Sequence, residues 1–190
     1  VTLMNTMMSA QTGTSSPYSR FGLGELNTND CAKYAALGGS AAYYNALSIN
    51  PSNPASYTAF KPNSFLFSTG GLHKTVKMQT NDKEQITNNS VLSHLLFGFP
   101  VSKKTGVSIG MIPYSSTGYM LNYRDEQNNA DMIYSGDGGL SKMYFGGAYK
   151  ITNSLSLGMN ASYLFGGLNR QKKVEFDDES IFNSRSVSRI

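Results

Sequence analysis

The sequence is poor in charge. Only 15% of its 190 residues are Asp, Glu, Lys or Arg, against roughly 25% in soluble domains. It has no Trp, a single cysteine at Cys31, and no apolar run as long as the roughly 18 residues that a membrane-spanning helix needs. These shortages exclude such a helix, an internal disulfide and a cysteine metal cluster. What is abundant is Gly and Tyr, which suits a β protein whose surface does not all face water.

The net charge of +4 does not indicate a nucleic-acid partner. The basic residues are scattered along the chain. The densest group, "RQKK" at residues 170–173, is followed at once by "EFDDE". A mixed-charge segment of this kind is a solvated surface.

The two histidines, His73 and His94, fall within predicted strands and have no carboxylate at a supporting spacing. We therefore expect no metal site, no cofactor, no catalytic residues and no enzymatic activity. Ser93 precedes His94 directly. Because adjacent residues of a strand point to opposite faces, we expect that the two side chains do not pair.

The first 62 residues do not have the periodicity of strands. Residues 1–10, "VTLMNTMMSA", look like the end of a secretory signal peptide cleaved after Ala10, or else a disordered tail. Residues 11–62 form a second unit, rich in Gly, Ser and Ala, with short helical turns expected within 29–47. This unit ends in the proline-rich stretch "INPSNPASYTAFKP".

Residues 63–190 alternate with a period of two. Strands are predicted at 65–78, 91–101, 107–123, 143–151 and 155–165, with the start of another at 181–190. In 155–165 one face is apolar and the other is small and polar, as in the strands of a transmembrane β-barrel. The fold class is therefore all-β, an antiparallel transmembrane barrel in the outer membrane of a Gram-negative cell.

The connections between these strands alternate in length. Long polar segments at 79–90, at 124–139 and from residue 169 onwards alternate with short ones at 102–106 and 152–154. Barrels with short periplasmic turns and long outer loops show this pattern. Because a membrane barrel needs at least about eight strands, we expect the five or six found here to be part of a longer protein, or else to be completed by other strands.

A proline interrupts the third predicted strand, "GMIPYSSTGYMLNY". Pro113 cannot donate a ladder hydrogen bond, so it predicts a bulge or a kink. One interpretation is a bulge that only adjusts the barrel's shape. The other is a lateral opening for an apolar ligand, formed by Pro113, Tyr114 and Gly118.

The segments "SPYSRFGLGEL" and "NPASY", which precede the first strand "KPNSFLFSTG", resemble the long-chain fatty acid transporter (FadL-like) family. The resemblance implies a barrel of about 14 strands whose lumen holds residues 11–62 as a plug. Phe21, Gly22 and Gly24 would belong to this plug. Asn53, Pro54 and Ala55 would form its hinge to the barrel, and the kink at Pro113 would be a side exit.

On this resemblance we expect passive, ligand-gated movement of a hydrophobic small molecule, with outer-membrane lipid as the surroundings. Two alternatives stay open. One is a non-transporting accessory barrel in a larger outer-membrane secretion or barrel-assembly complex, with other subunits as partners. The other is a secreted β-sandwich adhesin.

Overall fold

The structure is a computed structural model that describes residues 14–27, 34, 36, 38, 42, 44–79, 84–126, 130–176 and 183–190. The predicted signal-peptide remnant at residues 1–10 lies outside these residues, as does Cys31. So does most of the stretch in which short helical turns are expected. The described helical segments are the 3-10 helices η1 (Pro17–Arg20) and η2 (Pro54–Ala59), and Tyr34 and Ala36 are α-helical, as the sequence predicts for this stretch.

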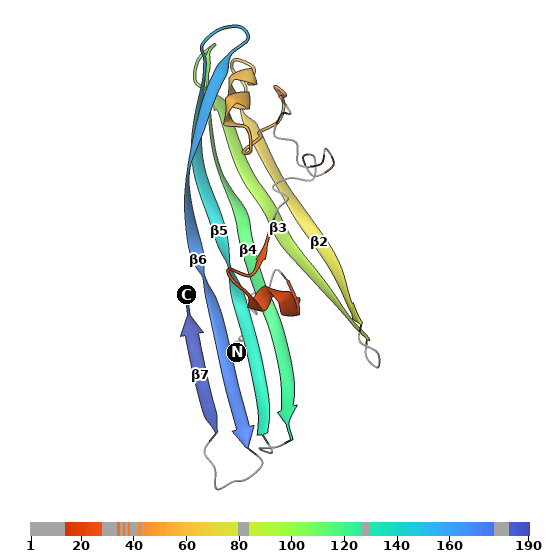
Figure 1. The fold of residues 1–190 in the computed structure, drawn as a ribbon. Coiled ribbons are helices and arrows are strands. Elements are labelled where there is room, and N and C mark those ends of the chain that lie inside the picture. The colour runs from red at the N-terminus through yellow and green to blue at the C-terminus, as the bar shows by residue number, and fades with distance from the viewer. Residues whose placement is uncertain are drawn as a thin grey trace, which may run out of the picture.

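One antiparallel sheet dominates the fold (Figure 1). Its long strands are β2 (Leu66–Gln79), β3 (Glu84–Pro100), β4 (Thr105–Asp125), β5 (Ala130–Lys150) and β6 (Ser156–Phe176), followed by the shorter β7 (Ser184–Arg189). They pair in sequence order, while the two-residue β1 (Glu25–Leu26) pairs with β4 away from this path. The predicted all-β antiparallel class is confirmed. The sheet is open, with β2 and β7 at its two ends, so the size of a closed barrel stays a prediction.

The strands are longer than the sequence predicts, and the predicted alternation of loop lengths is wrong. Residues 84–90 and 130–139, expected in long loops, belong to β3 and β5. The gaps between strands are similarly short at 80–83, 101–104 and 126–129. Residues 84–90 carry polar side chains on both faces, and in 130–139 the glycines and aspartates obscure the short alternation of Ala130, Met132 and Tyr134 with Asp131 and Ser135.

One face of the sheet is covered by the N-terminal region at the end where β3 turns into β4. The buried cluster there consists of Ile49, Tyr57, Phe60, Leu96, Ile112, Tyr144 and Ala148. Glycines on the sheet make room for η2: a Cβ on Gly106 would overlap the Tyr57 carbonyl, and one on Gly158 would overlap the backbone of Ala55. The small-residue face predicted from the sequence is thus the face on which η2 lies.

The opposite face carries an apolar belt. Across the strands, Phe67, Phe97, Ile109, Phe145 and Ala161 occupy one continuous row of paired positions. The belt's most exposed large side chains include Phe65, Phe67, Phe145, Leu157, Met159 and Tyr163. On β6 the apolar alternation runs from 157 to 165, close to the roughly 9–11 residues with which a tilted strand crosses a bilayer. Among the described residues, no helix is long and apolar enough to cross a membrane.

Candidate functional site

The most unusual feature of the sheet is the seam between β3 and β4. These strands pair from Leu95 opposite Met111 to Pro100 opposite Gly106 and then separate, while β4 remains paired with β5 along its whole length. In Figure 1 the β2–β3 hairpin diverges from β4 toward the end where β2 turns into β3. The register of β4 against β5 shifts between Pro113 and Ser115. Pro113 lies two residues beyond Met111, the last residue of β4 that pairs with β3, and the register shift beside it is the bulge that the sequence predicts.

Residues 14–27, hereafter the strap, occupy the β4 edge that β3 leaves. β1 places Glu25 opposite Ser116 and Leu26 opposite Ser115. The Asn27 amide donates to the carbonyl oxygen of Tyr114 at 2.9 Å. Further along β4, the amide of Gly118 donates to the hydroxyl of Ser19 at 3.1 Å. The strap thus satisfies backbone groups at Tyr114 and Gly118, two of the residues selected from the sequence.

A glycine lets the strap approach β4 closely. Gly24 has a φ of +91°, and a Cβ there would overlap the Thr117 hydroxyl and the Ser116 carbonyl. Both the backbone conformation and the lack of space therefore require glycine. Gly22 also has a positive φ, of +56°, but nothing lies within 4 Å of a Cβ placed there. The neighbouring Phe21 side chain is 70% exposed.

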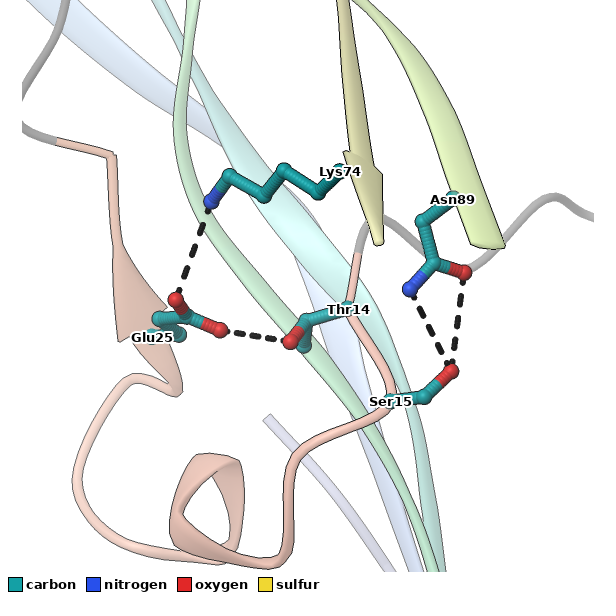
Figure 2. Close-up of polar contacts among 5 residues, drawn as sticks. All are labelled: Thr14, Ser15, Glu25, Lys74 and Asn89. Atoms are coloured by element: carbon teal, nitrogen blue, oxygen red, sulfur yellow. Dashed lines mark hydrogen bonds and ion pairs between the residues drawn. The ribbon is translucent and has the colours of Figure 1, made fainter. Parts of the chain in front are cut away.

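Polar side chains connect the strap to the separated hairpin, as Figure 2 shows. Glu25 accepts a hydrogen bond from the Thr14 hydroxyl and forms an ion pair with Lys74 of β2, at 3.7 Å. Ser15 contacts the side-chain amide of Asn89 on β3. The strap therefore bridges β4 and the β2–β3 hairpin. The ion pair is partly exposed, so it contributes little stability alone.

A cation–π contact and a hydrogen bond attach η1 and the turn after it to β5 and β6. The guanidinium of Arg20 lies 4.6 Å from the centre of the Tyr134 ring, and the Lys172 ammonium lies 5.6 Å from it. Arg170 donates to the carbonyl oxygen of Gly22. Cation–π contacts at such exposed sites are modest, about 0.5–1 kcal/mol each.

The second group of sequence-selected residues lies elsewhere. Asn53, Pro54 and Ala55 begin η2 and pack at the β6 end of the covered face, next to Gly158. Tyr57, one turn later, is fully buried, and its hydroxyl donates to Asn160 at 3.1 Å. Burial raises the pKa of Tyr57, so the phenol stays protonated as this donor requires. The structure therefore does not bring the predicted hinge and the predicted opening together.

The serine–histidine prediction is wrong. Ser93 Oγ lies 2.7 Å from His94 Nδ1, and Ser68 Oγ lies 3.0 Å from His94 Nε2. The cause is a bulge: Gly70 pairs with His94 and Gly71 with Leu92, which leaves Ser93 out of the ladder and free to turn. Among the described residues, no three His, Cys, Asp or Glu side chains are grouped so as to hold a metal ion.

Sequence reasoning missed Ser19, Glu25, Lys74 and Asn89, which do much of the bridging. Glu25 carried a weak signal, since it is the first acidic residue of the chain and stands in a segment with little other charge. Its partner Lys74 shares one face of β2 with Leu72, Val76 and Met78, so a lone lysine among apolar residues was a second weak signal. Nothing in the sequence shows which strand edge residues 14–27 would reach.

Comparison with known proteins gives one match. The family model BamG matches residues 1–190, and BamG is a family associated with the Bam complex, which assembles β-barrels in the outer membrane. No curated protein and no solved structure matches the chain. The resemblance to the long-chain fatty acid transporter family is therefore wrong, and with it the expected transport and plug. Two features suggested that resemblance, and the structure gives another reason for each. The small residues of the N-terminal segment allow it to pack closely on the sheet. The proline in the third long strand lies where β3 and β4 separate.

Proposed function

Because the chain belongs to the BamG family, we propose that it is a structural, non-transporting accessory subunit of the barrel-assembly complex of the Gram-negative outer membrane. The observation that carries this proposal is the family match over residues 1–190. The role was one of the alternatives that the sequence left open. It needs no catalytic group, and we propose that the subunit acts by binding alone.

The apolar belt supports an integral position in the membrane. Met159 is 77% exposed, Tyr163 71% and Leu157 61%, all on the face opposite η2. Contiguous apolar surface of this kind is costly in water and favourable against lipid tails. We therefore propose that the sheet contacts outer-membrane lipid through the belt.

The strand halves beyond the belt offer a polar surface to other subunits. There the outward face carries ion pairs such as Arg124 with Asp131, at 3.1 Å, and Lys173 with Glu175. Exposed charges of both signs set the orientation and the rate of association more than they set affinity. We assign contacts with partner subunits to this half of the sheet.

Gentle detergent extraction tests the proposal. We expect the full-length, affinity-tagged protein to co-purify from outer membranes with the subunits of the barrel-assembly complex in fixed ratio. The charge reversal Asp131→Arg, which removes the partner of Arg124, should lower the recovered ratio while the protein still reaches the membrane. Recovery of the protein free of every barrel-assembly subunit would overturn the proposal.

The integral position has its own test. Met159→Arg places a charge in the belt, whereas Val187→Arg, at a side chain that is 56% exposed on β7, places the same charge outside it. A cation at the bilayer midplane costs about 2–4 kcal/mol and much less near the interfaces. We expect Met159→Arg to fold poorly into lipid vesicles and Val187→Arg to fold normally. Equal folding of both variants would show that the belt does not face lipid.

A further inference from the structure

The free edge of β4 is the feature that the proposed function leaves unexplained. Alternate residues of an antiparallel strand direct their backbone N–H and C=O groups to the same side. On β4, Tyr114 and Gly118 direct them toward the side that β3 has left, since Asn27 and Ser19 bind them there. By the same alternation, Met120 and Asn122 direct theirs to that side too. In the described part of the chain, the pairing on this side beyond Met111 is that of β1.

The strap is held to this edge in a way that makes it replaceable. Its large apolar side chains are largely outside any core: Tyr18 is 83% exposed, Phe21 70% and Leu26 52%. By contrast, Tyr57 and Phe60 are 0% and 5% exposed, so η2 is anchored by buried aromatic rings. The strap depends mainly on polar contacts, and the backbone of another extended chain can replace those at the edge one for one.

The groove beside the strap has room for such a chain. A space of about 490 Å³ separates the hairpin from β4 and is lined by Ser15, Pro17, Met78, Gln85, Thr87, Tyr119, Met120 and Leu121. A second space of about 470 Å³ lies at the seam itself and includes Val91, Pro113 and Leu140 in its lining. Both walls mix apolar and polar side chains, which suits the two faces of an amphipathic strand.

We propose that residues 114–122 of β4 form a strand-acceptor site, which the strap occupies until an extended strand of an unfolded outer-membrane β-barrel protein replaces it. This assignment rests on the proposed function, because a barrel-assembly complex handles chains of that kind. The edge has the length of the strand it would bind, since a transmembrane strand has about 9–11 residues. Sheet edges are templates for pairing with another chain, and β1 shows that this edge accepts one.

A disulfide across β1 and β4 tests the exchange directly. Leu26 and Ser115 are paired opposite each other, and such pairs lie within the Cα separation that a disulfide spans, about 4.4–6.8 Å. Leu26→Cys with Ser115→Cys, in a Cys31→Ser background, closes the strap when oxidised and releases it when reduced. A photo-crosslinking benzoylphenylalanine in place of Met120, which is 72% exposed, reports on the groove.

The probe is a synthetic peptide with the sequence of residues 157–166 of this chain, "LGMNASYLFG", a strand with an outer-membrane pattern. The control is the same peptide with alternate backbone amides methylated, which cannot donate ladder hydrogen bonds. The full-length protein is used in detergent micelles, in both the oxidised and the reduced form.

We expect the reduced protein to label the probe at least tenfold more strongly than the oxidised protein, and the methylated peptide to be labelled weakly by both. Equal labelling of the probe by the two forms would overturn the proposal, as would no labelling by either. Crosslinks between two copies of the chain in the absence of peptide would identify a second copy as the occupant and would also overturn it. Co-purification with the barrel-assembly complex is measured separately. A chain that co-purifies but does not label the probe therefore refutes the strand-acceptor site and leaves the proposed function standing.

Discussion

A methyl group added at Gly106 or Gly158 should detach η2 from the sheet without disturbing the strands. The Cβ of Gly106→Ala would lie within 3.0 Å of the Tyr57 carbonyl oxygen, and that of Gly158→Ala within 3.0 Å of the Ala55 amide nitrogen. Both contacts are with backbone atoms, which cannot rotate away as a flexible side chain can. Each substitution therefore forces η2 outward and loosens the packing of the buried Tyr57 and Phe60.

The expected cost follows from this overpacking. Extra carbon atoms in a well-packed core cost about 1–3 kcal/mol, which corresponds to about a 5- to 150-fold change in an opening equilibrium. Hydrogen exchange measures that opening, because the amides of Ser56 and Phe60 are bonded within η2, to the carbonyls of Asn53 and Tyr57. We expect their exchange to accelerate by this factor while the amides in the paired part of β5 keep their protection.

Gly147 provides the matched control. It lies on β5 next to Gly146 but on the belt face, and the nearest atom to a Cβ there is Val107 Cγ1 at 4.0 Å. Gly147→Ala should leave the exchange of η2 unchanged, since it adds the same methyl group without a contact. Equal exchange in the Gly106→Ala and Gly147→Ala variants would refute the claim that the glycines of the covered face exist to admit η2.

Three further substitutions examine single interactions. Tyr57→Phe removes the hydrogen bond to Asn160 and should lower the free energy of unfolding, measured in urea with lipid vesicles, by about 0.5–1.5 kcal/mol; no change would mean that water replaces the bond. Ser19→Ala leaves the amide of Gly118 without its acceptor and should accelerate exchange at Gly118 at least fivefold, for a cost of about 1–3 kcal/mol. Ser16→Ala, at the N-cap of η1, whose side chain makes no capping hydrogen bond, should leave this exchange unchanged. Lys74→Met breaks the partly exposed ion pair with Glu25 and should cost less than about 1 kcal/mol; a larger loss on thermal melting would show that the strap is fixed rather than replaceable.

The parts of the fold that depend on local alternation could be predicted from the sequence. The apolar halves of β2 to β6 were found because period-two alternation appears wherever one face meets an apolar surface and the other packs against small residues. β2 and β4 were predicted over nearly their whole length, whereas the first halves of β3 and β5 and the second half of β6 were assigned to loops because charged, amide and glycine residues are frequent there. In Ala130–Lys150, for instance, the residues before Gly139 continue the ladder to β6, but Asp131, Asp137 and two glycines among them are typical of a loop.

The candidate site was predictable only in part. Pro113 identified the position of the seam, since a missing ladder donor and a bulge follow from the residue type alone. What the sequence did not contain is the tertiary pairing that places Ser19 and Glu25 on the β4 edge. That pairing depends on the positive φ angles of Gly22 and Gly24 and on the separation of the β2–β3 hairpin from β4. These features depend on contacts between segments far apart in the chain, which local sequence patterns do not show. The Ser93–His94 contact was missed for a similar reason, because the bulge that allows it is set by Gly70 and Gly71 on the partner strand.

The proposed position in the membrane explains why the seam opens where it does. In lipid, an unpaired backbone group has no water to bind and costs several kcal/mol, so strands must stay paired there. The β3–β4 pairs extend from Gly106 to Met111, and Met111 shares a row with Met143 and Tyr163 at the margin of the apolar belt. One step further, at Pro113, a ladder donor is missing and the strands part. Beyond the belt, water and the strap satisfy the exposed edge, so separation there carries little penalty. An acceptor edge placed at this margin stays in register with strands that are already embedded in lipid, and a strand paired to it would be aligned with the membrane before entering it.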